Sequence, residues 1–264
     1  MRHTIILLPI AIALAGCSGP EPSKAPESAD RDGFWQLELK NPPAENPATI
    51  PTARSDEPRW MRRHQRFVDQ ASRDDVDLLF IGDSITEQWF GPGLGIWRKR
   101  FVPLNAANFG MSADRTEHVL WRLENGILDR IDPKVVVLMI GTNNLKAGPV
   151  RMSPEQTALG VVAVVNLLLE KLPDARILVM EILPRQPEYD WIDGAIARTN
   201  ALLATCPEEL ERVDVVQISQ KFLDPAGRLD PKYYRTDKLH LSAEGYEIWA
   251  DAIEPEIRKT LPGS

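Results

Sequence analysis

The chain has 264 residues, of which 43% are hydrophobic and 26% are charged, so it can fill one globular core but is short for two full-size domains. A formal net charge of −7, with no dense Lys/Arg run beyond residues 97–101, argues against a nucleic-acid-binding surface. We expect that basic run to lie on the solvated face of a helix.

The first 16 residues have the features of a signal peptide: a basic start, an apolar run over residues 5–13 and small residues before Cys17. The apolar run is shorter than the roughly 20 residues that a membrane-spanning helix needs. The ending Leu-Ala-Gly-Cys resembles the lipobox of bacterial lipoproteins, in which cleavage leaves Cys17 as the lipid-bearing N-terminus. We therefore expect export and a lipid anchor in a bacterial membrane, on the periplasmic or cell-surface side. A plain secretory signal is the alternative.

Residues 17–55 are rich in Pro, Ser, Glu and Ala, and such a composition buries too little apolar surface to fold alone. We interpret them as a tether, with the folded domain at 56–262. Residues 34–39, Phe-Trp-Gln-Leu-Glu-Leu, are the exception and are expected to pack back on the domain as a short strand. With Cys17 lipidated, Cys206 is the only remaining thiol, and its position before a proline favours an inert thiol over a nucleophile.

Helical and strand patterns alternate after residue 55. Helices are predicted at about 59–72, 115–124, 154–172, 191–205 and 243–259, and strands at 76–81, 104–109, 135–140, 176–182 and 213–218. Short, wholly apolar strands between helices predict a mainly parallel five-stranded sheet covered on both faces, a flavodoxin-like α/β/α sandwich. Ligands of such sheets bind at the carboxyl ends of the strands.

Three predicted strands end in residues that suit acyl-transfer chemistry. They end in Gly-Asp-Ser, Asn-Phe-Gly and Ile-Gly-Thr-Asn-Asn, which brings Ser84, Gly110 and Asn143 to one edge of the sheet. We predict that the N–H groups of Ser84 and Gly110 and the side-chain amide of Asn143 form an oxyanion hole. Taken singly, Gly110 is equally well explained by a tight turn, and Asn143 is better explained as a turn residue. Gly82 is expected to permit a sharp turn before the serine.

A serine nucleophile needs a base and a group that orients the base. Of the four histidines, one lies in the signal, and His64 and His118 are flanked by apolar residues and are expected to pack or lie on the surface. His240 stands just before the last helix, three residues after Asp237. We therefore predict a Ser84–His240–Asp237 triad, the alternative being a pair that only caps the helix. Asp83, adjacent to the serine, is expected to be a turn or helix-start residue.

Four blocks, GDSIT, NFGMS, GTNN and DKLH, resemble in order and spacing the signature blocks of the SGNH hydrolases, also called GDSL esterases. Over about residues 46–261 the chain is most similar to the catalytic (alpha) subunits of intracellular platelet-activating-factor acetylhydrolase. The resemblance implies a carboxylic ester hydrolase with a tight acyl pocket. No cluster of residues has metal-ligand spacing, and this chemistry needs neither metal nor other cofactor. Animal relatives pair as dimers, so a homodimer is one expectation here.

Departures from that family bear on the substrate. Ser112 and Ala113 replace a glycine pair, and Arg115 stands where threonine is usual, at positions expected to line the mouth of the site. We predict hydrolysis of acetyl or other short-chain oxygen esters of carbohydrate or glycan substrates. The alternatives are a lysophospholipase or thioesterase, a glycan O-acetyltransferase, and a binding protein on a hydrolase scaffold. The glycine-rich residues 91–95 do not both follow a strand and open a helix, as a phosphate-binding loop does, so a nucleotide site is not expected.

Overall fold

The computed structural model describes residues 33–73, 75–146, 151–186 and 192–261. Within these ranges a single sheet has the strand order β2-β1-β3-β4-β5, and every neighbouring pair is parallel. The strands are β1 (Leu78–Gly82), β2 (Ala106–Gly110), β3 (Val135–Met139), β4 (Arg176–Met180) and β5 (Val213–Val216). The helices are α1 (Pro58–Ala71), α2 (Ser84–Glu87), α3 (Leu94–Arg100), α4 (Thr116–Glu124), α5 (Pro154–Lys171), α6 (Ile192–Leu203) and α7 (Ala243–Thr260). The predicted parallel α/β/α fold is confirmed.

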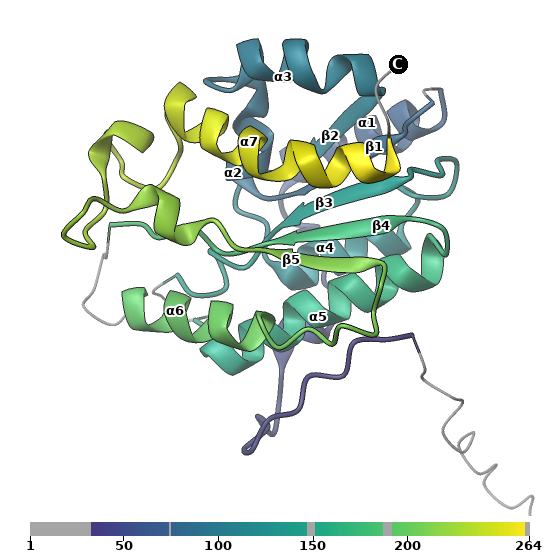
Figure 1. The fold of residues 1–264 in the computed structure, drawn as a ribbon. Helices are drawn as coiled ribbons and strands as arrows, with labels where there is room; N and C mark the ends of the chain where they lie inside the picture. The colour runs from purple at the N-terminus through teal and green to yellow at the C-terminus, as the bar shows by residue number, and fades with distance from the viewer. Residues whose placement is uncertain (1–32, 74, 147–150, 187–191, 262–264) are drawn as a thin grey trace, which may run out of the picture. The chain divides into compact units, whose positions relative to one another are not determined.

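Helices cover both faces of the sheet (Figure 1), with α3 and α7 on one face and α4, α5 and α6 on the other. Alternation along β1 shows why its strand pattern is continuously apolar. Leu79 and Ile81 pack in the core that α1, α4 and α5 build, whereas Leu78 and Phe80 pack on the opposite face against α3 and α7. Because both faces are buried, neither set of side chains is polar.

Two short helices, α2 and α3, lie outside the helix ranges predicted from the sequence. α2 has four residues and α3 has seven, so neither carries a long periodic pattern. α3 begins within the glycine-rich stretch, so these glycines open a helix, with Gly93 as its N-cap. They follow a 3-10 helix (Gln88–Phe90) rather than a strand. Arg98 and Lys99 are exposed on α3, as expected for a solvated face.

Residues 33–57, which we call the N-terminal strap, pack against the domain. Trp35 is 1% exposed, and its backbone N–H donates to Asn166 Oδ1 (2.8 Å) while its carbonyl accepts from Asn166 Nδ2 (3.0 Å). Ala48 is buried, and its carbonyl accepts from the Thr116 hydroxyl at 2.8 Å. The domain therefore starts before residue 56, because a few large apolar side chains fix a segment of otherwise tether-like composition. Residues 34–39 pack back as expected but form no strand.

The predicted signal peptide, the lipidation site at Cys17 and the first part of the tether lie outside the described residues. Across the residues that are described, no helix has the length and apolar character needed to cross a bilayer.

Candidate active site

Ser84 lies where β1 ends and α2 begins. Asp83 is the N-cap of α2, and its Oδ1 accepts a hydrogen bond from the Ile85 N–H at 2.9 Å, which makes Asp83 a helix-start residue as expected. Gly82 does not have the positive φ of a tight glycine turn. A Cβ there would collide with the Met139 carbonyl and the Thr86 side chain, so the glycine serves close packing of β1 against β3 and α2.

His240 contacts both of its predicted partners. Its Nε2 is 2.9 Å from Ser84 Oγ, and its Nδ1 is 2.8 Å from Asp237 Oδ2. The second oxygen of Asp237 accepts hydrogen bonds from the backbone N–H groups of Leu239 (3.0 Å) and His240 (2.9 Å). The three side chains thus form one continuous hydrogen-bonded series, although Ser84 and His240 are 156 residues apart in the sequence.

The Asp237 carboxyl is more acidic than an ordinary aspartate. Partial burial opposes ionisation, but hydrogen bonds from the ring and N–H of His240 and from the Leu239 N–H outweigh it and lower the pKa of Asp237 to about 2. A carboxylate facing Nδ1 favours the tautomer with the proton on that nitrogen. Nε2 is then left with a lone pair directed at the Ser84 hydroxyl.

Gly110 does not present its N–H to a substrate. The N–H donates to Asn108 Oδ1 at 2.8 Å, so the prediction of Gly110 as an oxyanion donor is wrong for this structure. Its lack of a side chain has a different cause, because a Cβ would collide with the backbone of Thr86 and Glu87 in α2. Asn108 also donates from Nδ2 to the Thr86 carbonyl at 2.8 Å. Gly110 allows α2 to approach the end of β2 closely, and the Asn108 hydrogen bond holds α2 there.

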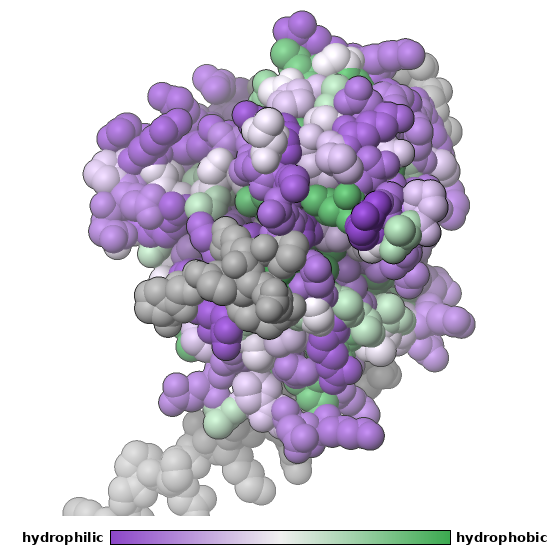
Figure 2. Space-filling view, turned by 90° about the vertical axis from the view of Figure 1, so that its left-hand side faces the viewer, coloured by the Kyte–Doolittle hydropathy of each residue, from purple (hydrophilic) through white to green (hydrophobic). Residues whose placement is uncertain are grey.

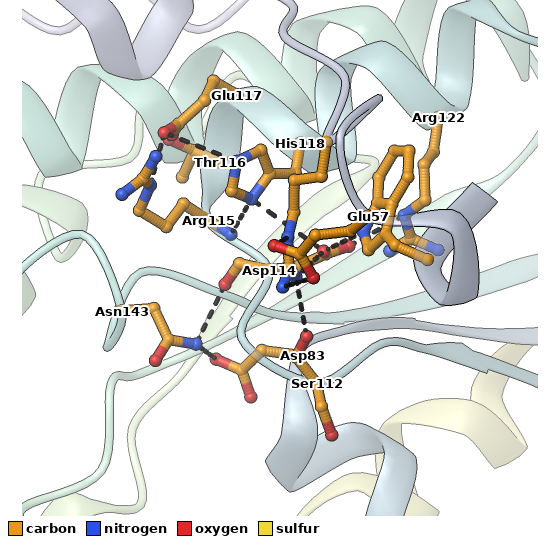
Figure 3. A network of polar contacts seen from close by, with 12 residues as sticks. Glu57, Asp83, Ser112, Asp114, Arg115, Thr116, Glu117, His118, Arg122 and Asn143 are labelled. Carbon is orange, nitrogen blue, oxygen red and sulfur yellow. Dashed lines mark hydrogen bonds and ion pairs between the residues drawn. The ribbon is translucent and has the colours of Figure 1, made fainter. Parts of the chain in front are cut away.

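The Asn143 amide reaches the site edge and is oriented by two neighbours (Figure 3). Nδ2 donates to the Asp114 carbonyl at 2.9 Å and makes a longer contact of 3.4 Å with Asp83 Oδ2. Asp83 is 1% exposed, and this burial raises the pKa of its carboxyl to about 7. The hydrogen bond from the Ile85 N–H lowers the pKa, whereas the nearby Asp114 charge adds to the increase.

A turn at Ser112–Asp114, which we call the 112–114 turn, lies next to Asn143. Ala113 has φ of 62°, a left-handed conformation that is costly for alanine, and its N–H has no acceptor among the described residues. On the far side of the turn, the buried Asp114 carboxylate pairs with Arg122 Nε at 2.9 Å and accepts from Trp60 Nε1 at 2.7 Å. Alanine itself carries no signal for a positive φ, and the only sequence feature that marks Ala113 is its replacement of a glycine of the resembling family.

Other residues singled out in the sequence lie elsewhere. His64 and His118 are each 5% exposed and pack around Trp60 (Figure 3 shows His118), and burial with neighbouring arginine charges lowers the pKa of His118 to about 3. Arg115 pairs with Glu117 rather than lining the mouth of the site. Trp89 is fully buried in the core, and Trp191 lies outside the described residues.

Cys206 is a half-buried thiol that packs against the core. Burial, reinforced by the Asp214 charge, raises its pKa to about 11, which fits an inert thiol. In the described part of the chain, no three His, Cys, Asp or Glu side chains gather in a way that would hold a metal ion.

A serine at the end of a parallel strand, joined in one hydrogen-bonded series to a histidine and a carboxylate from the loop before the last helix, is typical of serine hydrolases. The GDSL-like Lipase/Acylhydrolase family matches residues 80–248. Platelet-activating factor acetylhydrolase IB subunit alpha2 of Rattus norvegicus is 38% identical over 204 residues, covering 76% of this chain and 86% of that protein. Subunit alpha1 of Bos taurus is 38% identical over 220 residues, covering 82% and 91%. The chain therefore belongs to the GDSL acylhydrolase family and is a carboxylic ester hydrolase.

Solved structures share the fold at low sequence identity. A putative acylhydrolase from Bacteroides fragilis superposes with a TM-score of 0.62 at 21% identity, covering 75% of this chain and 96% of that one. A catalytic mutant of an acetylxylan esterase from Geobacillus stearothermophilus gives a TM-score of 0.51 at 21% identity, covering 70% and 94%.

Proposed function

We propose that the protein is a serine esterase that hydrolyses short-chain oxygen esters, acetyl esters above all, through an acyl-enzyme. The observation that carries this proposal is the hydrogen-bonded series from Asp237 through His240 to Ser84, with distances of 2.8 and 2.9 Å. No step of this chemistry requires a metal or other cofactor.

In the proposed mechanism Ser84 Oγ attacks the ester carbonyl while His240 Nε2 accepts the hydroxyl proton. The imidazolium is stabilised by the Asp237 carboxylate and then protonates the leaving alcohol, whose departure leaves Ser84 acylated. Water attacks the acyl-enzyme with His240 as base, and the acid and a free serine are released.

The developing oxyanion needs preorganised donors. We assign the Ser84 N–H and the Asn143 Nδ2 to this role, together with the Ala113 N–H in place of that of Gly110. The support for Ala113 is its N–H without an acceptor among the described residues, and its position next to Asp114, whose carbonyl orients the Asn143 amide at 2.9 Å.

Acetylated carbohydrate or glycan fragments are the substrates we propose. Figure 2 faces the left-hand side of Figure 1 and, outside the grey atoms, shows mainly hydrophilic residues with hydrophobic ones in small separate groups. Such a surface suits a polar leaving alcohol better than a lipid chain. The names of the relatives, acetylhydrolase and acetylxylan esterase, agree with an acetyl group on the acyl side.

The test is acetate release from acetylated xylan, acetylated pectin, O-acetylated sialic acid and a lysophospholipid, each compared with Ser84→Ala. We expect release from one or more of the acetylated glycans, and none from the variant. A parallel series of acetyl, butyryl and octanoyl p-nitrophenyl esters should show rates that fall with chain length. A rise with chain length would favour the lysophospholipase or thioesterase reading, and acetylated acceptor accumulating faster than acetate would favour a transferase.

A further inference from the structure

The 112–114 turn holds a conformation that its own sequence disfavours. Ala113 has φ of 62°, and for a residue with a Cβ such a conformation costs roughly 1–3 kcal/mol unless surrounding contacts fix it. Both Ser112 and Ala113 are exposed, so packing does not hold them. The conformation must therefore be held by polar contacts from neighbouring elements.

Glu87 makes the shortest of these contacts. Its Oε2 accepts hydrogen bonds from both the Ser112 N–H (2.7 Å) and the Ser112 hydroxyl (2.6 Å). Its Oε1 pairs with Arg63 Nη1 at 2.8 Å, and the same guanidinium donates to the Gly110 carbonyl at 3.3 Å. Both oxygens of the Glu87 carboxylate are therefore held in place. The carboxylate in turn binds Ser112, the residue immediately before Ala113.

The turn is also held from the opposite side. Arg54, in the N-terminal strap, donates to the Ser112 carbonyl at 2.9 Å and also pairs with the Glu57 carboxylate at 2.6 Å. Both peptide groups of Ser112 are thus anchored, one by Glu87 and one by Arg54.

Glu87 ends the helix that Ser84 begins. α2 has only four residues, and it is seated on β2 through Asn108 and the close approach of Gly110. The nucleophile and the Glu87 carboxylate therefore belong to one short rigid piece. Because Glu87 binds Ser112, it fixes the distance between Ser84 and the 112–114 turn.

Resting on the esterase function proposed above, we propose that Glu87 is a positioning residue for the oxyanion hole. By accepting two hydrogen bonds from Ser112 it fixes the Ala113 N–H relative to Ser84 Oγ before substrate arrives. Preorganised donors stabilise the transition state without reorganisation during the reaction, so loosening this turn lowers the rate more than substrate binding.

The test is steady-state hydrolysis of p-nitrophenyl acetate by Glu87→Ala, Glu87→Gln and Ser112→Ala, with Glu124→Ala as an exposed glutamate control. Active sites are counted with a serine-directed phosphonate, so that unfolded protein does not enter the rates. We expect Glu87→Ala to lower kcat and kcat/KM together by about tenfold or more, since misplacement of a catalytic group by about 1 Å can cost a hundredfold. Glu87→Gln keeps an acceptor for Ser112 and should restore most of the rate.

The coupling between the two residues gives the sharpest outcome. Ser112→Ala removes only the hydroxyl contact and should cost about threefold in the parent but little in the Glu87→Ala background. The proposal is overturned if Glu87→Ala keeps kcat within about twofold, if Glu87→Gln is as impaired as Glu87→Ala, or if the Ser112→Ala loss is undiminished in the double variant. If Glu87→Ala does not fold, Glu87→Gln and Ser112→Ala are each compared with the parent, and a Ser112→Ala kcat equal to that of the parent overturns the proposal. Failure of the esterase function itself is distinguishable, because the unmodified protein would then match Ser84→Ala.

Discussion

In the proposed mechanism Asp237 acts through His240, and its two oxygens make different hydrogen bonds. Oδ1 accepts from the Leu239 and His240 N–H groups and holds the loop, while Oδ2 faces the imidazole at 2.8 Å. An asparagine preserves the first contact, but its amide would donate toward Nδ1 and favour the unproductive tautomer.

We therefore expect Asp237→Asn to fold normally and to lose about ten-thousandfold in kcat, the scale set by the same substitution in a serine-protease triad. Asp230→Asn is the matched control, because Asp230 accepts from the Lys232 N–H at 2.9 Å in the same loop and has no contact with the imidazole. Ester hydrolysis and circular dichroism of both variants check this. Equal activity of the two variants would contradict the role proposed for Asp237.

Asp83 makes the stability of the fold depend on pH. Burial raises its pKa from the ordinary 3.8 to about 7, so between these values the folded state binds more protons than the unfolded state. The free energy of unfolding therefore falls as pH rises through that window.

Asp83→Asn keeps an acceptor for the Ile85 N–H and removes the titration. The variant should gain roughly 2–3 kcal/mol relative to the parent between about pH 5 and pH 8, at about 1.4 kcal/mol per pH unit within the window. Urea unfolding at both pH values measures this difference. A stability difference that does not change with pH would show that the Asp83 carboxyl has its ordinary pKa.

At the scale of elements, β2 and α2 lie so close together that a single added methyl group at their contact would collide with the α2 backbone. A Cβ on Gly110 would overlap the backbone of Thr86 and Glu87, whereas a Cβ on Gly95 in α3 would meet open space.

The two glycines should respond in opposite directions to alanine. Gly110→Ala should destabilise the fold by about 1–3 kcal/mol and displace Ser84, with a fall in kcat. Gly95→Ala should stabilise it by about 0.5–1 kcal/mol, because alanine is a better helix former than glycine. Urea unfolding and ester hydrolysis of both variants test this pair. Normal activity and stability in Gly110→Ala would mean that the close approach is easily relieved.

The same elements show what a sequence can and cannot predict here. All five strands lie within about two residues of their predicted positions because their apolar runs and bounding polar residues are unambiguous. α2 and α3 are too short for a periodic signal, and the strap is fixed by a few apolar side chains, Trp35 among them, within a tether-like composition.

In the site, the arrangement of Ser84, His240 and Asp237 was predictable because residue type, order and strand-end position agree. The oxyanion donor was not, because sequence cannot reveal that the Gly110 N–H binds Asn108 or that Ala113 adopts a positive φ. These properties depend on which neighbour satisfies which backbone group.

At the scale of the whole molecule, the strap links the N-terminal region to the active site. It packs along α5 through Trp35 and ends with Arg54 on the Ser112 carbonyl. Cys17 and the rest of the proposed lipoprotein signal precede this strap in the sequence.

We propose that Cys17 is lipidated and that this modification alone retains the protein at the membrane. Cys17→Ser should abolish incorporation of a fatty-acid probe and move the protein to the soluble fraction. Its kcat on p-nitrophenyl acetate should stay unchanged, because the contacts between the strap and the rest of the domain do not involve Cys17. Fractionation of cells producing each form, with the probe detected by mass spectrometry, makes the comparison. Undiminished membrane association of Cys17→Ser would contradict the anchor.

The central claim is that Ser84 carries the acyl group during turnover. Acid quenching of the reaction with p-nitrophenyl acetate within its first turnovers, followed by peptide mass spectrometry, tests it most directly. We expect an acetyl group on Ser84 that disappears once substrate is exhausted, and neither acetylation nor turnover in Ser84→Ala. Continued hydrolysis by Ser84→Ala, or turnover with the acetyl group on another residue, would contradict it.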